Sequence, residues 1–150
     1  MKLRLYLDTS VFSARIDERA PDRRALTEDF WKTLPCYEPA TSMLAVEELR
    51  QTANPQLRSR MEAMLAGFNL IAVTDEMRRL AEMYIAEGAF TRSMTNDSVH
   101  VAAATLSRQD VLVSWNFKHL VNRRRRAMVA GVNAREGLPV LDILSPPELQ

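Results

Sequence analysis

Carboxylate or amide side chains recur in this sequence at four points where an apolar run meets the expected start of a helix. Asp8 follows an apolar run, Glu47 and Glu48 lie in a segment that begins after a serine, Asp97 follows an asparagine, and Asn116 follows another apolar run. Oxygen atoms of carboxylates and amides are the ligands that Mg²⁺ and Mn²⁺ prefer. If the fold brings these points together, the pattern predicts a divalent-metal site.

The chemistry of such a site follows from the ion. Two or three carboxylates suffice to hold Mg²⁺ against a substrate phosphate, because the ion keeps several waters. A bound ion polarises a phosphoryl oxygen and lowers the pKa of water, and a second ion can stabilise the leaving oxygen. The residues therefore predict metal-assisted hydrolysis of a phosphodiester, with Asp8, Glu48 and Asp97 as the ligands.

Alternating short strands and helices must position these residues. Apolar alternation and β-branched runs predict strands over residues 2–8, 37–40, 70–73, 111–114 and 140–143. Helical periodicity and capping residues predict helices after residue 9 and over residues 24–34, 43–49, 55–65, 76–87, 98–106 and 123–135. This order favours an α/β fold, a three-layer α/β/α sandwich with a central parallel sheet. Because ligands bind at the carboxyl ends of such strands, one edge should collect all four points.

Each candidate also has a purely structural interpretation. Asp8 and Asp97 stand where helix N-caps stand, and a Glu pair in mid-helix is usually a solvated face. His100 lies one turn after Asp97 and is expected to have a structural role, whereas His119 is expected to be exposed at the surface.

Three other features are expected to be structural or to carry little chemistry. Cys36 is predicted to be a small buried hydrophobe, and Trp115 is expected to be buried at a strand end rather than to stack on a nucleobase. The basic run 123–126 fans around a helix axis, so that at most two of its side chains would grip one nucleic-acid backbone.

Composition bounds the class of protein. The 150 residues fit one domain over 1–150, and 47% hydrophobic residues suffice for a core. The net charge of +1 gives no general attraction to nucleic acid, so any such affinity must be local. A single cysteine suits a reducing compartment, and the sequence shows no signal peptide or membrane-spanning run. We therefore expect a soluble, cytoplasmic protein without a membrane partner.

The four segments together resemble a PIN domain of the bacterial VapC toxin type. Asp8 in Leu-Asp-Thr-Ser-Val-Phe matches the first acid of that family, Glu48 in Val-Glu-Glu-Leu the second, and Asp97 in Asp-Ser-Val-His-Val-Ala the third. Asn116 stands where many members carry a fourth acid, and Ser114 stands where a Ser or Thr often accompanies it. The likeness covers nearly the whole chain.

The resemblance implies a five-stranded parallel sheet, Mg²⁺- or Mn²⁺-dependent endoribonuclease activity on RNA, a homodimer, and inhibition by a partner antitoxin. Asp8, Glu48, Asp97 and Asn116 would be the catalytic residues. The sequence departs from the pattern in two ways: Asn116 is neutral, and Glu47 beside Glu48 leaves two choices for the second acid. We choose Glu48, because it directly precedes a leucine, and expect Asn116 to weaken a second metal ion rather than abolish the first.

Two rival functions remain open from the sequence. In the first, a PIN-like fold no longer cuts and serves as an RNA- or protein-binding regulatory module, with Asp8 and Asp97 kept as helix caps. In the second, Asp8 forms an aspartyl phosphate. Phosphatases of that kind carry another Asp two residues later, where this chain has Ser10.

Overall fold

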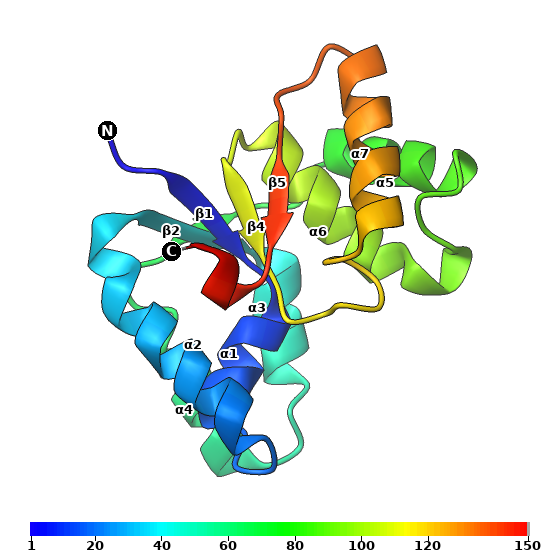
Figure 1. The fold of residues 1–150 in the computed structure, drawn as a ribbon. Helices are drawn as coiled ribbons and strands as arrows, with labels where there is room; N and C mark the ends of the chain where they lie inside the picture. The colour runs from blue at the N-terminus through cyan, green and yellow to red at the C-terminus, as the bar shows by residue number, and fades with distance from the viewer. Residues whose placement is uncertain (150) are drawn as a thin grey trace.

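Five parallel strands form one sheet in the computed structural model, which describes residues 1–149 (Figure 1). The strands are β1 (Arg4–Leu7), β2 (Glu38–Ser42), β3 (Asn69–Ile71), β4 (Val111–Val113) and β5 (Asp142–Leu144). They lie in the order β3-β2-β1-β4-β5. The α/β fold with a central parallel sheet is thus confirmed, with strand ends that differ from the predicted ones by at most two residues.

Alternation along the central strands divides the core into two halves. Tyr6 and Leu112 are paired across β1 and β4, and both enter the core on one face of the sheet. Leu5, Leu7 and Val113 enter the core on the other face. Because successive side chains of a strand point to opposite faces, both faces of this sheet must be covered by helices.

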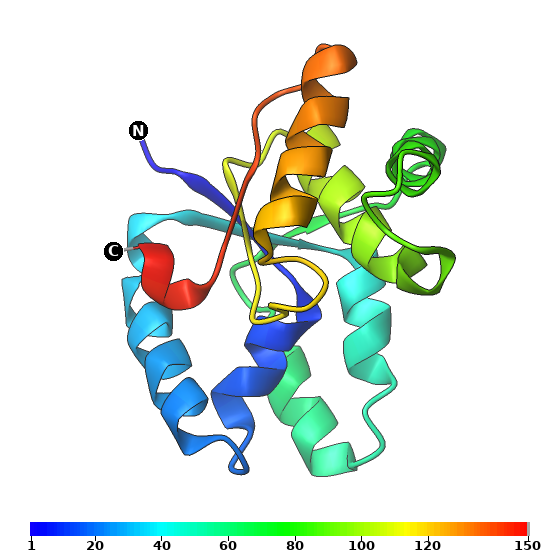
Figure 2. The ribbon, with the colours of Figure 1, turned by 45° about the vertical axis from the view of Figure 1, so that its right-hand side comes forward.

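Seven α-helices provide that cover (Figure 2). Those that accompany Leu5 and Leu7 in the core are α1 (Thr9–Ile16), α2 (Pro21–Thr33), α3 (Met43–Arg50) and α4 (Pro55–Ala63). Those on the Tyr6 face are α5 (Asp75–Ala86), α6 (Thr95–Leu106) and α7 (Arg123–Arg135). Short 3₁₀ turns cover Leu34–Cys36, Arg92–Met94 and Pro146–Leu149. Within residues 1–149, no helix is long and apolar enough to cross a bilayer.

Most helix starts agree with the capping residues that the sequence offers. Asp8 accepts a hydrogen bond from the Ser10 backbone at the start of α1, and Ser42 accepts one from Ala45 at the start of α3. Helix α2 begins three residues before the predicted start, because Pro21 fits the first helical position, where its missing N–H is not needed.

Helix α6 departs from prediction in a way that matters for the site. It begins at Thr95 without a side-chain cap, so Asp97 lies in its first turn and does not cap it. From Ser98 to Thr105 every side chain of this helix is buried, and its three consecutive alanines are fully enclosed. Small side chains allow α5 to pack closely on α6, the most extensive contact between two helices in the fold.

Three further expectations, two for single residues and one for the basic run, have mixed outcomes. Trp115 is buried, as predicted. Cys36 is exposed and not a buried hydrophobe, because it ends a 3₁₀ turn at the surface before β2. In the basic run, Arg125 donates to the backbone oxygen of Ala89 and Arg126 pairs with Glu148, so two of the four arginines make intramolecular contacts.

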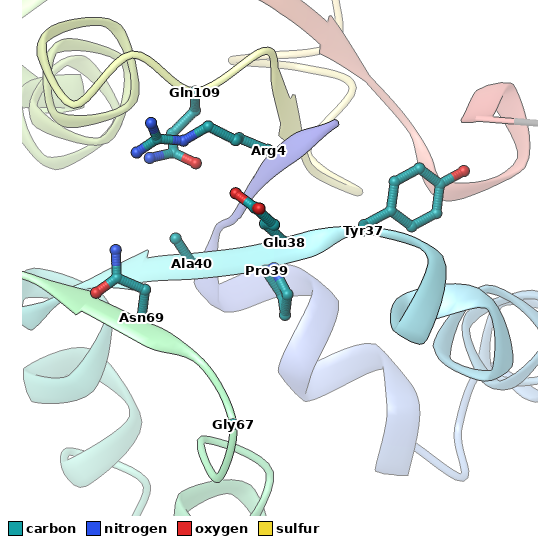
Figure 3. A pocket seen from close by; sticks show the side chains of 8 residues that line it. All are labelled: Arg4, Tyr37, Glu38, Pro39, Ala40, Gly67, Asn69 and Gln109. Carbon is teal, nitrogen blue, oxygen red and sulfur yellow. The ribbon is translucent and has the colours of Figure 1, made fainter. Parts of the chain in front are cut away.

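The amino ends of the strands enclose a pocket of about 330 Å³, and Figure 3 shows its side chains. Arg4 and Gln109 share the backbone oxygen of Ser107 as an acceptor there. The Gln109 side-chain oxygen is buried and has no hydrogen-bond partner within residues 1–149. Glu38 and Asn69 line the same pocket from the first residues of β2 and β3.

Candidate metal centre

Asp8 stands directly after β1, at the point where the order of the strands reverses. The chain passes from β1 to β2 on one side, but β4 lies on the other side of β1. The Asp8 backbone N–H donates to the Val113 oxygen at 3.2 Å and ties the ends of β1 and β4 together. In an open parallel sheet this reversal opens a crevice in which ligands bind.

Both carboxylate oxygens of Asp8 accept hydrogen bonds from serine hydroxyls. Ser10 Oγ donates to Oδ1, and Ser114 Oγ donates to Oδ2 at 2.6 Å. Oδ1 also accepts the Ser10 backbone N–H at 3.0 Å, so Asp8 caps α1 as well as facing the site. These bonds fix the plane of a carboxylate that is only 4% exposed.

Burial raises the pKa of Asp8 above its ordinary value. The charge of His100 and the hydrogen bonds of Ser10 and Ser114 oppose this rise, and the charge of Asp97 adds to it. A buried carboxylate that is unfavourable as an anion gains from a nearby cation more than a solvated one does.

Glu48 lies on α3 and reaches the same edge from the β2 side. Its Oε1 accepts from Thr9 Oγ1 at 2.8 Å and lies 2.6 Å from His100 Nε2. Burial alone would raise the pKa of Glu48, but the hydrogen bond and charge of His100 outweigh it and lower that pKa. Glu47 is exposed on the neighbouring face of α3, so Glu48 is the member of the pair that contacts Thr9 and His100.

His100 is the centre of a buried hydrogen-bond chain. Its Nδ1 lies 2.7 Å from the Tyr6 hydroxyl, which donates to Ser42 Oγ at 2.7 Å. Nε2 donates to Glu48, because a carboxylate can only accept. Burial would lower the pKa of His100, yet Glu48, Asp8 and Asp97 together raise it.

Asp97 approaches from the first turn of α6. Its Oδ2 lies 2.9 Å from His119 Nδ1, and the Asp97 side chain is 22% exposed. His119 is therefore not the free surface histidine that the sequence predicted. The turn that follows β4 brings it back over α6 to orient an acid of the site.

Asn116 does not extend toward the carboxylates through its side-chain oxygen. That oxygen accepts the His119 backbone N–H at 2.9 Å, and the Asn116 backbone N–H donates to Ser114 Oγ at 2.9 Å. Asn116 thus shapes the turn that carries His119 and Ser114, and each of these contacts one of the acids.

Glu48 lies 2.6 Å from the buried His100, and Asp8 and Asp97 lie near enough for their charges to act on its ring. Asp8, Glu48 and Asp97 all raise the pKa of His100, and Asp97 also raises that of Asp8. Within residues 1–149, however, no three acidic, cysteine or histidine side chains already stand in a metal-coordinating group. The donors fit Mg²⁺ or Mn²⁺ in chemical kind, and protein hydrogen bonds occupy them in the present arrangement.

Some of the residues that orient the acids were not predicted from the sequence. Thr9, which bonds Glu48, Ser10, which bonds Asp8, and the Tyr6–Ser42 hydrogen bond were not among the expected site features. One signal was available, since Tyr6 stands between Leu5 and Leu7 in a strand with an apolar run, and a buried tyrosine hydroxyl needs a partner.

Solved structures with this fold are proteins of toxin–antitoxin systems. VapBC2 from Rickettsia felis, solved bound to a DNA fragment from its promoter, aligns with a TM-score of 0.59 at 15% identity over 95% of this chain and 98% of its own. VapBC-1 from nontypeable Haemophilus influenzae aligns with a TM-score of 0.61 at 15% identity over 97% and 99%. VapC20 from Mycobacterium tuberculosis, a toxin that cleaves the sarcin-ricin loop, aligns with a TM-score of 0.62 at 14% identity over 77% and 92%.

Comparison by sequence, unlike comparison by structure, finds no match. No protein-family model matches this chain. No curated protein matches it either. At these identities the structural likeness establishes the fold, which is the PIN-like α/β/α fold of VapC toxins and the one that the four motifs imply.

Proposed function

We propose that this chain is a metal-dependent endoribonuclease that hydrolyses RNA phosphodiester bonds and acts as the toxin of a toxin–antitoxin pair. The observation that carries the proposal is that Asp8, Glu48 and Asp97, each held by a protein hydrogen bond, lie near His100 at the strand-order reversal. The fold that presents these acids is shared with VapC toxins, one of which cleaves RNA.

Asp8, Asp97 and Glu48 would hold Mg²⁺ or Mn²⁺. When bound, the ion supplies positive charge to the phosphodiester and lowers the pKa of water. Hydrolysis adds the elements of water across one P–O bond, leaving a phosphate on one fragment and a hydroxyl on the other.

The residues of the chain prepare this site by fixing the acids before substrate arrives. Ser10 and Ser114 set the plane of Asp8, Thr9 and His100 hold Glu48, and His119 holds Asp97. Removing a residue that hydrogen-bonds a metal-ligating side chain typically lowers metal affinity or activity by about 10- to 100-fold. Asn116 contributes through the turn that it stabilises and not as a fourth acid.

Two partners belong to the same proposal. The similar structures from Rickettsia felis and Haemophilus influenzae are VapBC toxin–antitoxin proteins, which supports an antitoxin partner for this chain. We also propose a homodimer, which light scattering of the purified protein would test against a monomer of 17.1 kDa.

A non-catalytic binding module is the second candidate, and one observation favours it. Each acid of the site already has a protein hydrogen-bond partner, and residues 1–149 hold no ready metal-coordinating group. Calorimetric titration with Mn²⁺ separates the two candidates, because a nuclease of this kind must bind the ion whereas a binding module need not. An aspartyl-phosphate mechanism is disfavoured, since both Asp8 oxygens accept serine hydroxyls in a nearly closed environment.

The deciding experiment is cleavage of a mixed pool of structured RNAs with Mg²⁺ or Mn²⁺. The arms are wild type, wild type with EDTA, Asp97→Asn and Glu47→Gln. Glu47 lies beside Glu48 but is exposed, so its variant controls for a change in acidic character alone. We expect cleavage by wild type and Glu47→Gln only. Cleavage that survives Asp97→Asn would indicate a contaminating nuclease, and absence of cleavage together with absence of Mn²⁺ binding would favour the binding module.

A further inference from the structure

A groove of about 510 Å³ adjoins the carboxylate site and plays no part in the mechanism above. It runs between α1 and the turn after β4, with Arg23 of α2 on its rim. Ser10 and Asn116 line it where it meets the site, and Ser10 is the residue whose hydroxyl holds Asp8. A chain whose phosphate lies at the acids would therefore continue into this groove. The volume is within the range of small-molecule sites, about 300–1,000 Å³.

Phe117 presents an exposed aromatic ring in this groove. The side chain is 48% exposed, and it is the one aromatic among the large hydrophobic residues exposed within residues 1–149. Its ring packs edge-to-face on buried Trp115, with centroids 6.0 Å apart at 68°. Trp115 is fixed in turn, since its indole N–H donates to Thr27 at 2.8 Å. A rigidly supported aromatic face that remains in water is the form of a stacking platform.

Cations accompany the ring. The Arg23 guanidinium carbon lies 5.0 Å from the Trp115 ring centre and 6.0 Å from that of Phe117. Lys118 is exposed beside them, and neither cation forms an ion pair within residues 1–149. The groove's own carboxylate, Asp17, is bound to Arg19. The free charge of the groove is thus positive and suits a phosphate, in contrast to the acidic site next to it.

We propose that this groove binds one unpaired nucleobase of the RNA substrate, stacked on Phe117, with Arg23 and Lys118 contacting the adjoining phosphate. This inference rests on the proposed ribonuclease function and adds that the RNA substrate must present an unpaired base. A base can stack on a side chain only when it has left its own helix, so the cleaved bond lies in a loop or single strand. A continuous A-form duplex offers no such base.

The test measures affinity without cleavage. Fluorescence anisotropy in EDTA follows a labelled single-stranded RNA and the same RNA annealed to its complement, with wild type, Phe117→Ala, Phe117→Trp and Leu70→Ala. Leu70 is comparably exposed but lies on the edge strand β3, so it controls for the loss of an exposed apolar side chain. A 2-aminopurine in the RNA reports stacking directly. Melting curves verify that the variants are folded.

We expect Phe117→Ala to weaken single-strand binding about tenfold, which is the effect typical of losing one base–aromatic stack. Phe117→Trp should retain both affinity and the quenching of 2-aminopurine, Leu70→Ala should match wild type, and duplex binding should be weaker and unaffected by Phe117. An equal loss with Leu70→Ala, or an equal loss on duplex RNA, overturns the inference.

The result also separates the groove from the nuclease. Unchanged RNA affinity in Phe117→Ala, in a protein that cleaves RNA, overturns the groove inference, points to a protein as the ligand of Phe117 and leaves the proposed function standing. Phe117-dependent binding in a protein that cleaves nothing supports the groove and overturns the nuclease. Wild type that binds no RNA overturns the groove.

Discussion

The two ends of the sheet are both polar and both hollow, yet they differ in how their polar groups are satisfied. At the carboxyl ends, every acid has a partner, and the hydrogen bonds run through His100 from Glu48 to Tyr6. At the amino ends, the pocket of Figure 3 leaves the Gln109 oxygen without a partner in the described residues. A concave surface alone therefore does not identify the functional site. What identifies it is a set of converging groups of like charge, each held in place by a hydrogen bond.

Parallel topology produces this difference. Helices α1 and α3 begin at the carboxyl ends of β1 and β2; the first turn of α1 orients Asp8 and Glu48 through Ser10 and Thr9, and Glu48 lies in the second turn of α3. The amino ends receive the loops that follow helices, and these bring single residues such as Gln109 by separate routes. The carboxyl edge therefore gathers side chains that lie on or next to helices, and helices hold side chains more precisely than loops do.

The largest expected effect is the loss of RNA cleavage when an acid of the carboxyl edge is removed. Asp8→Asn keeps the shape and the helix cap but removes a charge, so cleavage should fall by roughly 10³-fold, equivalent to about 4 kcal/mol of transition-state stabilisation. Glu38→Gln removes one charge at the amino edge and should leave the rate of cleavage unchanged. Single-turnover cleavage rates of the two variants measure this difference. Equal losses of rate in both variants would show that the two edges do not differ in function.

A smaller loss is expected from the partner of Glu48. His100→Asn withdraws the donor at Nε2 and should lower kcat by about 10- to 100-fold with little change in KM. His100→Gln places an amide N–H near the position of Nε2 and should recover part of the loss. Steady-state kinetics of the pair checks this, and a drop in His100→Gln as deep as that in His100→Asn would argue for a role other than positioning Glu48.

The third prediction concerns stability without metal. Burial raises the pKa of Asp8 in the folded protein, so its ionised form costs folding free energy; this cost is fully present above the folded pKa and is lost as the pH falls from the folded pKa to the ordinary pKa of the unfolded chain. Asp8→Asn, although impaired as an enzyme, should therefore be more stable than wild type in EDTA at neutral pH and show a higher Tm. Thermal melts across pH should show the gap closing toward acid. A gap that widens toward acid would contradict the assignment.

The smallest effect is expected at the amino edge. Gln109→Met replaces a side chain whose oxygen has no partner but whose N–H₂ donates to Ser107, so the two changes should nearly cancel, to within about 1 kcal/mol. Urea denaturation measures the difference. A loss of more than about 3 kcal/mol would mean that the pocket in Figure 3 is as tightly organised as the carboxylate edge.

Much of the fold could be predicted from the sequence because its signals are local. Alternation in β1 and the capping position of Asp8 before α1 act within a few positions of where they stand. Asp8, Glu48 and Asp97 could be placed at one edge because parallel strands share a direction.

The contacts among those residues could not be predicted, because they join positions far apart in the chain. Tyr6 and His100 are 94 residues apart and meet only because β1 and α6 pack together. His119 reaches Asp97 through a turn whose shape depends on the Asn116 side chain. Cys36 was misplaced because its exposure depends on where a short turn emerges beside β2, which no period in the sequence encodes.

The enclosure of α6 has a consequence for how this protein can change over generations. The helix that presents Asp97 and His100 offers no free face from Ser98 to Thr105, so enlarging any of these side chains strains the packing against the sheet or α5. Selection for a folded chain and selection for chemistry thus fall on the same few positions. Variation should accumulate on the outer faces of α2 and α5, while α6 admits almost none.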